Sequence, residues 1–372
     1  MIVVALSGGV DSAVAAALLK QQGHEVVGVT MQIWPDEGAA ARERKGGCCA
    51  AGATRDARAV AALLDIPYYV FQMREVFERH VIRSFAAAYA AGRTPNPCIA
   101  CNQHIKFAAL VDKARNFGAT ALATGHYARI RPAVPSGQPR LLRAADRRKD
   151  QSYVLYPLRR SELAFFRFPI GELADKAETR RLAAALGLPV AAKPDSQEIC
   201  FVGEEGYAAV VAARHPQAEL PGPILDAAGS VLGQHRGLAH YTVGQRKGLG
   251  LHAATPYFVV ALDPERNALV VGTAGQTHAH ACSLSHVNWL ADQPQDGAAV
   301  TVKVRAGPAE HAAHVWADGA QGLRVTFDAP VRAVTPGQAC VLYDGEVVIG
   351  GGEIDAVHRS PTSSSEPVLA RA

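Results

Sequence analysis

The chain has 372 residues, of which 49% are hydrophobic and 19% are charged, and its formal net charge is +4 at pH 7. At roughly 150 residues per domain this length predicts two or three domains, and the composition excludes a collagen-like or generally disordered chain. No apolar run in the sequence reaches the roughly 18–20 residues that span a bilayer. Residues 1–6 lack the basic leader of a signal peptide. We therefore expect a cytoplasmic protein with no membrane partner.

Strand and helix signals alternate along the first part of the chain. Short apolar runs predict strands at residues 1–6, 25–31, 68–71 and 119–124. Helical patterns lie between them, at residues 13–22, 50–64, 74–91 and 98–117. Strands that alternate with helices indicate a parallel sheet with helices on both faces. We therefore predict an α/β fold whose N-terminal domain is a doubly wound parallel sheet.

The pattern changes after Phe201. Residues 219–275 are punctuated by Gly and Pro, and residues 280–358 contain short β-branched segments such as Val-Thr-Val-Lys-Val at 300–304. These features favour two small, mainly β domains, and the Ser-rich tail is expected to be disordered. The predicted regions are an α/β domain at 1–205, a small central domain at 206–275, a β-barrel-like domain at 276–358 and a disordered tail at 359–372.

A basic stretch covers residues 129–149. It contains seven Arg or Lys residues, with Asp146 as its single acid. Charge alone leaves two interpretations open, a solvated hairpin or a surface that contacts an anionic partner.

The strongest motif is Ser-Gly-Gly-Val-Asp-Ser at residues 7–12, between the first predicted strand and helix. Paired glycines turn backbone amides towards an anion, and the following helix adds its positive end. The hydroxyls of Ser7 and Ser12 can donate to phosphate oxygens, and Asp11 can reach a nucleotide-bound Mg²⁺. The motif is neither a Walker A loop nor Gly-x-Gly-x-x-Gly. It resembles the PP-loop of the ATP-pyrophosphatase superfamily, which implies that ATP adenylates a substrate oxygen and that a nucleophile then displaces AMP.

Seven cysteines supply candidate nucleophiles, and their odd number argues against a disulfide framework. Cys98 and Cys101 lie at a predicted helix start, where the positive helix end favours the reactive thiolate. This Cys-x-x-Cys pattern alone fits a redox pair, half of a zinc site or simple packing, and Cys200 is a third candidate thiol. The remaining cysteines are interpreted as structural: Cys48 and Cys49 at a helix start, and Cys282 and Cys340 in β segments.

Five further segments follow the phosphate loop in order. They are Thr-Pro-Asn-Pro-x-x-x-Cys-Asn at 94–102, Ala-Thr-Gly-His-Tyr at 123–127, Lys-Asp-Gln-Ser-Tyr at 149–153, the Cys200 segment at 193–201, and Tyr-Thr-Val-Gly-Gln-Arg at 241–246. Together they cover roughly residues 1–355 and resemble the tRNA-specific 2-thiouridylase family, commonly called MnmA. The resemblance implies ATP-dependent 2-thiolation of the wobble uridine, position 34, of tRNA, with AMP and diphosphate as products.

The resemblance also implies residue roles. The residues implied to bind ATP are Ala5, Leu6, Ser7, Gly8, Gly9, Val10, Asp11, Ser12, Met31 and Gly125. Cys200 would carry a persulfide received from a sulfur-relay protein or cysteine desulfurase, with Cys101 as the partner thiol and a catalytic disulfide between the two. Those implied to contact the target base or the tRNA anticodon loop are Asn96, Pro97, Cys98, His126, Lys149, Asp150, Gln151, Arg305, Ala306 and Gln338. On this basis the basic 129–149 stretch is expected to contact RNA, although an isolated histidine such as His126 is more often structural.

The implied chemistry is coherent. Adenylation converts the uracil C2 oxygen into a good leaving group, and a persulfide anion attacks C2 more readily than a thiol does. A second thiolate then breaks the sulfur–sulfur bond by exchange, which leaves a Cys101–Cys200 disulfide for a reductant to restore. The base has to be splayed out of the anticodon loop to react.

One position departs from the family pattern, because Cys98 stands where many members have Asp. An acid/base role of that Asp does not transfer to a thiol. The change creates a set of three cysteines, Cys98, Cys101 and Cys200, which could hold a [4Fe–4S] cluster with one open iron. Persulfide and cluster chemistry are therefore both open at this point.

Two other functions compete with thiolation. Another PP-loop enzyme, such as an amidotransferase or a lysidine synthase, would not need Cys101 or Cys200. A non-enzymatic RNA-binding protein would account for the basic stretch but would leave the phosphate loop without a purpose.

Overall fold

The computed structural model describes residues 1–33, 51–134, 137–195, 199–319 and 322–359. The predicted disordered tail beyond residue 359 and the predicted structural role of Cys48 and Cys49 lie outside the described residues.

A five-stranded parallel sheet forms the N-terminal domain, with β1 (Ile2–Ala5) at its centre. β2 (Val26–Gln32) and β3 (Tyr68–Gln72) follow on one side, and β4 (Ala121–Ala123) and β7 (Phe166–Arg167) follow on the other. The four predicted strands are confirmed. β7 was not predicted, because two residues are too few to carry a strand period.

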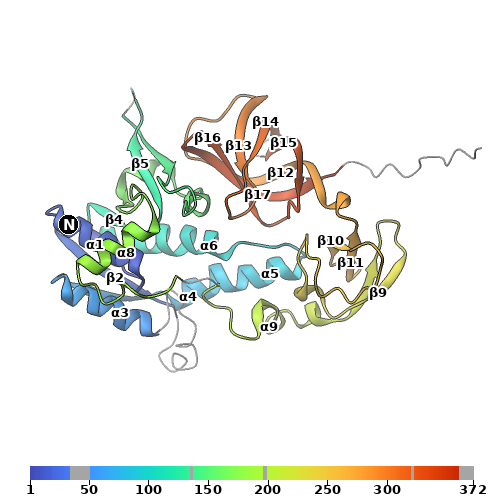
Figure 1. Ribbon diagram of the computed structural model, residues 1–372, viewed down its shortest axis with the longest axis horizontal. Coiled ribbons are helices and arrows are strands. Elements are labelled where there is room, and N and C mark those ends of the chain that lie inside the picture. Colours follow the sequence, from blue (N-terminus) through green and yellow to red (C-terminus); the bar gives the residue numbers. More distant parts are fainter. Residues whose placement is uncertain (34–50, 135–136, 196–198, 320–321, 360–372) are drawn as a thin grey trace, which may run out of the picture.

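Alternate residues of β1 face opposite helical layers, as the pleat of a strand requires. Ile2 and Val4 pack with α1 (Val10–Gln21) and α3 (Ala51–Leu63). The intervening residues of β1 pack against helices from the 74–116 part of the chain. Both faces of the sheet are covered, so the predicted doubly wound arrangement is confirmed (Figure 1).

Two helical runs cover the second face. In chain order their pieces are α4 (Arg74–Phe77), a π-helical stretch (Glu78–Arg83), α5 (Ser84–Ala90), α6 (Pro97–Ala100), a longer π-helical stretch (Cys101–Ala109) and α7 (Leu110–Asn116). Asn96 caps the second run, since its side chain accepts a hydrogen bond from the Cys98 amide at 3.0 Å. Pro97 takes the first helical position, where its missing N–H costs nothing.

The basic stretch forms the antiparallel hairpin of β5 (Ala128–Pro132) and β6 (Pro139–Arg143). β6 pairs with the last strand of the chain, so this hairpin extends the C-terminal sheet. The six other strands of that sheet are β12 (His278–Trp289), β13 (Ala298–Lys303), β14 (His311–Asp318), β15 (Gly322–Arg332), β16 (Ala339–Asp344) and β17 (Val347–His358). Pairing of β12 with β17 closes these six into a barrel, and Cys282 and Cys340 lie buried in its core as predicted.

A separate four-stranded sheet lies between the two domains in sequence and has its own apolar core. Its strands are β8 (Gly222–Leu225), β9 (Val231–His235), β10 (Phe258–Asp263) and β11 (Ala268–Gly272). The remaining helices are α8 (Lys176–Ala185) and α9 (Gly206–Ala212). Short 3₁₀ turns occur at Ser152–Leu155, Arg160–Phe165, Pro216–Glu219, Leu238–His240 and Gly275–Thr277.

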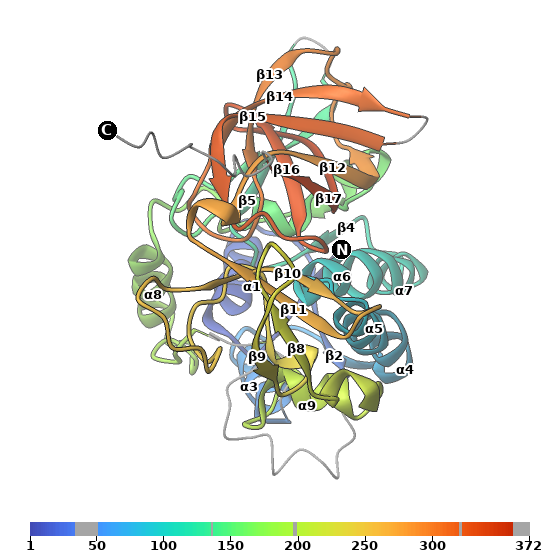
Figure 2. The same cartoon turned by 90° about the vertical axis from the view of Figure 1, so that its right-hand side faces the viewer.

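The three parts are arranged around the helical runs (Figures 1 and 2). The barrel lies above α5 and α6, and the sheet of β8–β11 lies beyond the end of α5, away from the parallel sheet. The predicted fold class, a parallel α/β domain followed by two small mainly β domains, is confirmed. None of the described helices combines the length and apolar character needed to cross a membrane.

Candidate active site

The chain makes a tight turn between β1 and α1. Gly8 has a φ of +67°, and a Cβ atom there would lie 2.3 Å from the carbonyl oxygen of Ala53, so the turn requires glycine. The Ser7 amide donates to Ser12 Oγ at 3.1 Å, and Ser12 Oγ donates to the Gly9 carbonyl at 3.1 Å. The turn is thereby closed on the first residues of the helix, the arrangement that binds phosphate.

Gly125 follows β4 and packs directly on this turn. A Cβ atom at Gly125 would lie 2.5 Å from the amide nitrogen of Ser12. The strand order runs outward from β1 in both directions, so the carboxyl ends of β1 and β4 flank a topological switch point. Ligands of doubly wound sheets bind at this position.

A cavity of about 470 Å³ opens there. Nine residues that the family resemblance assigns to ATP line it: Ala5, Ser7, Gly8, Gly9, Val10, Asp11, Ser12, Met31 and Gly125. Leu6 is buried behind the turn, where its carbonyl accepts a hydrogen bond from Thr30. Cys101 lines the same cavity. The structure therefore brings a candidate nucleophile and the phosphate turn to one space.

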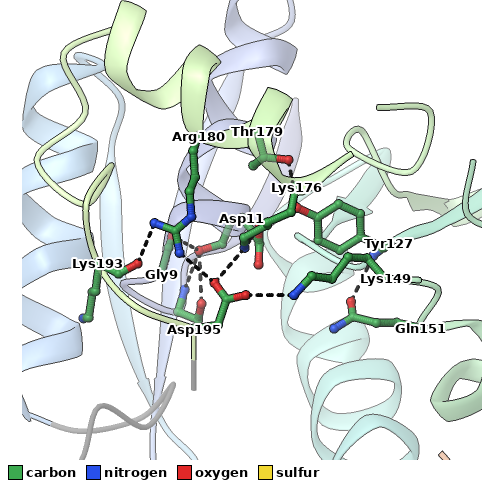
Figure 3. Close-up of polar contacts among 12 residues, drawn as sticks. Gly9, Asp11, Tyr127, Lys149, Gln151, Lys176, Thr179, Arg180, Lys193 and Asp195 are labelled. Carbon is green, nitrogen blue, oxygen red and sulfur yellow. Dashed lines mark hydrogen bonds and ion pairs between the residues drawn. The ribbon is translucent and has the colours of Figure 1, made fainter. Parts of the chain in front are cut away.

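Asp11 is held in place by neighbouring side chains (Figure 3). The Tyr127 hydroxyl donates to Asp11 Oδ1 at 2.8 Å and lies 2.8 Å from Thr179 Oγ1. Burial, with the nearby Asp11 charge, raises the pKa of Tyr127, so its hydroxyl keeps its proton. Lys176 Nζ lies 2.6 Å from the same oxygen of Asp11. The carboxylate is therefore oriented before any nucleotide is bound.

Lys193 holds the turn from the other side. Its Nζ donates to the Gly8 carbonyl at 2.9 Å and to Asp56 Oδ2 at 2.5 Å. This contact fixes the backbone of the turn at Gly8, one of the residues that line the cavity described above.

The three candidate thiols have different surroundings. Cys101 begins the π-helical stretch and is partly exposed, whereas Cys98 is exposed one turn earlier. Cys200 is partly exposed, and the next residue, Phe201, is buried with its ring centroid 6.0 Å from that of Phe77 and 5.2 Å from that of Phe85. Cys101 and Cys200 pack against the same apolar core. The segment of Cys200 is thus anchored on the helices that adjoin Cys101.

The three thiols and Asp11 are the donors that a [4Fe–4S] cluster and Mg²⁺, respectively, would use. The described residues include Cys98, Cys101 and Cys200, and no group of three or more His, Cys, Asp or Glu among them is placed to hold a metal ion. The described residues therefore show no ready-made metal site at these three thiols, and the choice between persulfide and cluster chemistry stays a prediction. Mg²⁺ is different, because it is usually held by one or two carboxylates together with nucleotide phosphates, and Asp11 offers such a carboxylate at the cavity.

His126 is buried rather than displayed. It is 8% exposed, and its Nδ1 lies 2.7 Å from Thr124 Oγ1. Its ring packs against those of Phe107 and Phe168, whose centroids lie 5.9 and 6.0 Å from its own. Burial, together with the charge of Lys106, holds its pKa well below the usual value, so the ring is neutral. It nevertheless lines the cavity. Contact with tRNA stays a prediction for this residue.

The segment 149–151 is divided between two environments. Lys149 and Gln151 line the cavity, and Gln151 accepts a hydrogen bond from the Tyr127 amide at 3.0 Å. Asp150 is buried and accepts from the Ser152 hydroxyl at 2.9 Å and from Lys303 at 3.3 Å. Contact of Lys149, Asp150 and Gln151 with tRNA stays a prediction.

The remaining predicted contact residues lie along the join of the helices and the barrel. Asn96 and Pro97 line a second cavity, of about 600 Å³, which lies between the helices and the barrel. Gln338 donates to the Thr94 carbonyl at 2.7 Å and so positions the start of that loop. Arg305 and Ala306 are exposed on the barrel.

The solvated-hairpin interpretation of the basic stretch is wrong for two of its arginines. Arg143 is fully buried, pairs with Glu310 at 2.5 Å and stacks 3.5 Å from the ring centroid of Tyr343. Arg129 is also buried and pairs with Glu346 at 2.9 Å. These charges join the hairpin to the barrel. The residues left exposed on this stretch are Arg131, Arg140, Arg147, Arg148 and Lys149.

The cavity residues that received no role from the sequence include Tyr127, Lys176, Lys193 and Asp195. Tyr127, Lys193 and Asp195 fall within segments that the family resemblance singles out, which is the signal that could have found them. Lys176 begins α8, and no spacing in the sequence connects it with the phosphate turn.

Comparisons with known proteins match almost the whole chain. Three family models match, described as tRNA methyl transferase HUP domain over residues 1–204, tRNA methyl transferase PRC-barrel domain over 210–273 and aminomethyltransferase beta-barrel domain over 279–354. The tRNA-specific 2-thiouridylase MnmA of Moorella thermoacetica is 51% identical over 356 residues, which is 95% of this chain and 99% of that protein. That of Paramagnetospirillum magneticum is 48% identical over 359 residues, 95% of each chain.

Among solved structures, NMN synthetase from Francisella tularensis is 17% identical and covers 52% of this chain and 65% of its own, with a TM-score of 0.29. That similarity is too low to carry an argument. The sequence relatives are sufficient, because they match almost the whole chain at close to half identity. The chain belongs to the MnmA family of tRNA-specific 2-thiouridylases, which are sulfurtransferases.

Proposed function

We propose that this protein uses ATP to replace the C2 oxygen of the wobble uridine of tRNA with sulfur carried as a persulfide on Cys200. The observation that carries the proposal is the shared cavity, which places Cys101 beside the phosphate turn. In this scheme residues 1–205 perform both chemical steps, residues 276–358 contact tRNA and residues 206–275 connect the two.

The first step activates the base. Amides of residues 8–12 and the positive end of α1 bind the phosphates of ATP, and the uracil C2 oxygen attacks the α-phosphate. Diphosphate leaves, and the C2 oxygen becomes part of a good leaving group. Mg²⁺ held by Asp11 would neutralise charge on the phosphates.

The second step delivers sulfur. The terminal sulfur of the Cys200 persulfide attacks C2, and AMP leaves with the oxygen, which gives a Cys200–S–S–C2 adduct. The Cys101 thiolate then attacks the Cys200 sulfur, and the electron pair of the broken bond stays on the sulfur attached to C2. The products are 2-thiouridine and a Cys101–Cys200 disulfide, which a reductant returns to two thiols.

The substrate and the sulfur donor are macromolecules in this proposal. The exposed basic residues of the hairpin and Arg305 on the barrel would bind the phosphates of the anticodon arm. The base would be splayed out of the loop to enter the cavity. A sulfur-relay protein or cysteine desulfurase would load Cys200.

Nucleoside mass spectrometry of tRNA incubated with the protein, ATP, Mg²⁺, a reductant, and a cysteine desulfurase with cysteine as the persulfide source tests the proposal. We expect 2-thiouridine at position 34 and one AMP for each base modified. Cys200→Ala should still form AMP in the presence of tRNA but no 2-thiouridine. Cys282→Ala is the matched control, because this thiol is buried in the barrel and should leave the chemistry intact. Normal thiolation by Cys200→Ala would disprove the sulfur assignment.

The same assay separates the competing functions. An amidotransferase or a lysidine synthase would keep its activity after replacement of Cys101 or Cys200, and a purely RNA-binding protein would not turn over ATP. Iron and acid-labile sulfide, measured after anaerobic purification, separate the two sulfur mechanisms. We expect thiolation by iron-free protein, because in the proposed scheme the Cys200 persulfide and the Cys101 thiolate carry out the sulfur transfer without a cluster.

A further inference from the structure

Three cations converge on the carboxylate of Asp195 at the edge of the cavity (Figure 3). Asp195 has no role in the proposed thiolation reaction. Asp195 Oδ1 lies 3.0 Å from Lys176 Nζ and 3.1 Å from Arg180 Nη2, and Asp195 Oδ2 lies 3.1 Å from Lys149 Nζ. Lys176 and Arg180 come from α8, whereas Lys149 comes from the segment after the basic hairpin. Asp195 therefore joins two parts of the chain that are distant in sequence.

This cluster belongs to the phosphate end of the cavity. Lys176 contacts Asp195 and also lies 2.6 Å from Asp11 of the phosphate turn, so one ammonium group links the two carboxylates. Asp11, Lys149, Lys176 and Asp195 all line the cavity. The Lys149 side chain is 42% exposed and that of Asp195 is 27% exposed, so these ion pairs are open to a ligand that enters.

The arrangement matches the way proteins bind phosphate. Lysine and arginine donors at about 3 Å around a single oxyanion are the usual phosphate ligands. Here a carboxylate of the chain occupies the centre of that donor set. Burial raises the pKa of Asp195, but Lys176 and Lys149 outweigh it and hold the pKa below its usual value, so the carboxylate is charged at neutral pH.

We propose that Asp195 is a positioning residue that takes the place of phosphate oxygens when no nucleotide is bound. Its carboxylate holds Lys149, Lys176 and Arg180 together against their mutual repulsion. The β- and γ-phosphates of ATP, and the diphosphate product, replace it among these cations. This proposal rests on the proposed function, because it names the groups that bind the diphosphate half of ATP.

The exchange of the Asp195 carboxylate for phosphate oxygens should also favour release of the diphosphate product. Diphosphate has to compete with Asp195 for the same three cations, so the carboxylate weakens product binding and lets the cluster return to its starting arrangement. AMP lacks the β- and γ-phosphates and does not compete. The affinity for AMP should therefore be independent of Asp195.

Calorimetric binding of ATP, diphosphate and AMP to the full chain tests the proposal. In Asp195→Asn, diphosphate and ATP should bind about fivefold more tightly, because a competing charge close to the ligand is removed, whereas AMP affinity should change by less than about twofold. In Lys176→Gln, ATP and diphosphate should bind about tenfold more weakly, whereas the affinity for AMP should again be nearly unchanged. Glu172→Gln is the matched control, because it also removes one acidic charge but pairs with Arg131 outside this cavity.

Weaker or unchanged diphosphate binding in Asp195→Asn would overturn the proposal. If that variant does not fold, Asp195→Ser carries the same prediction, and normal diphosphate binding by Lys176→Gln overturns the proposal independently. Failure of the wild-type protein to bind ATP would instead disprove the proposed function. A structural role for Asp195 alone predicts weaker binding of all three ligands, which also counts against the exchange.

Discussion

Two clusters of alternating charges in the described part of the chain differ in burial. The first follows the cavity and runs from Asp11 through Lys176 to Asp195 and Lys149. The second joins the basic hairpin to the barrel, where the side chain of Lys303 is only 3% exposed and pairs with Asp150 at 3.3 Å. Lys–Asp ion pairs therefore occur both at the partly exposed cavity and in the buried join between the hairpin and the barrel.

The difference indicates which charges can change partners. A partly exposed ion pair can exchange one oxyanion for another, because water and ligand replace the contact that is lost. A buried ion pair cannot, since removal of one partner leaves a charge without compensation in the interior. Lys149 and Asp150 are neighbours in sequence, yet the first belongs to the cavity and the second to the structural join.

The largest effect is expected for a charge at the cavity. Asp11→Ala should lower tRNA-dependent AMP formation about a thousandfold or more, because it removes the ligand proposed for Mg²⁺ and the partner of Lys176. Binding of tRNA, measured by filter retention, should largely survive. Normal AMP formation by this variant would show that the cavity charges do not take part in the chemistry.

The next largest effect is a loss of stability, and it is expected when a charge is removed from the buried cluster. Lys303→Met should lower the free energy of unfolding by about 3 kcal/mol or more, because it leaves the buried Asp150 carboxylate without its cation. The matched change Lys149→Met should lower it by less than about 1 kcal/mol, because this lysine is substantially exposed. Chemical denaturation measures both. If the two variants lose the same free energy of unfolding, burial does not distinguish the two clusters.

The pH dependence of stability tests the burial of His126 beside the cavity. Its pKa in the folded chain lies well below that of the unfolded chain, so only the unfolded chain gains a proton as the pH falls below about 6.5. Stability should therefore fall with acidification, and His126→Gln should lose about 1 kcal/mol less than the wild type between about pH 7.5 and about pH 5.5. His24→Gln, at an exposed histidine, is the control and should follow the wild type.

The smallest effect is expected at the exposed edge of the hairpin. Arg131 pairs with Glu172 at 2.7 Å, but both side chains are about half exposed. Arg131→Gln should change the free energy of unfolding by less than about 1 kcal/mol, whatever it does to RNA affinity. A loss as large as that of Lys303→Met would mean that exposure does not separate the two kinds of charge.

Local patterns in the sequence were enough for four of the five strands of the parallel sheet and for the phosphate turn. The turn depends on consecutive residues, and the conformation of Gly8 follows from the motif. The location of Lys176 could not be predicted, because it reaches Asp11 only after α8 has packed beside α1. The burial of Arg143 was equally hidden, since its partner Glu310 comes from the barrel, 167 positions along the chain.

The account depends on Cys101 and Cys200 reacting at the same base that the phosphate turn helps to activate. One turnover of persulfide-loaded protein with tRNA and Mg²⁺·ATP, without reductant, followed by peptide mass spectrometry, tests this most directly. We predict one Cys101–Cys200 disulfide for each 2-thiouridine formed, and none when ATP is omitted. Formation of 2-thiouridine while both thiols remain reduced would contradict the account.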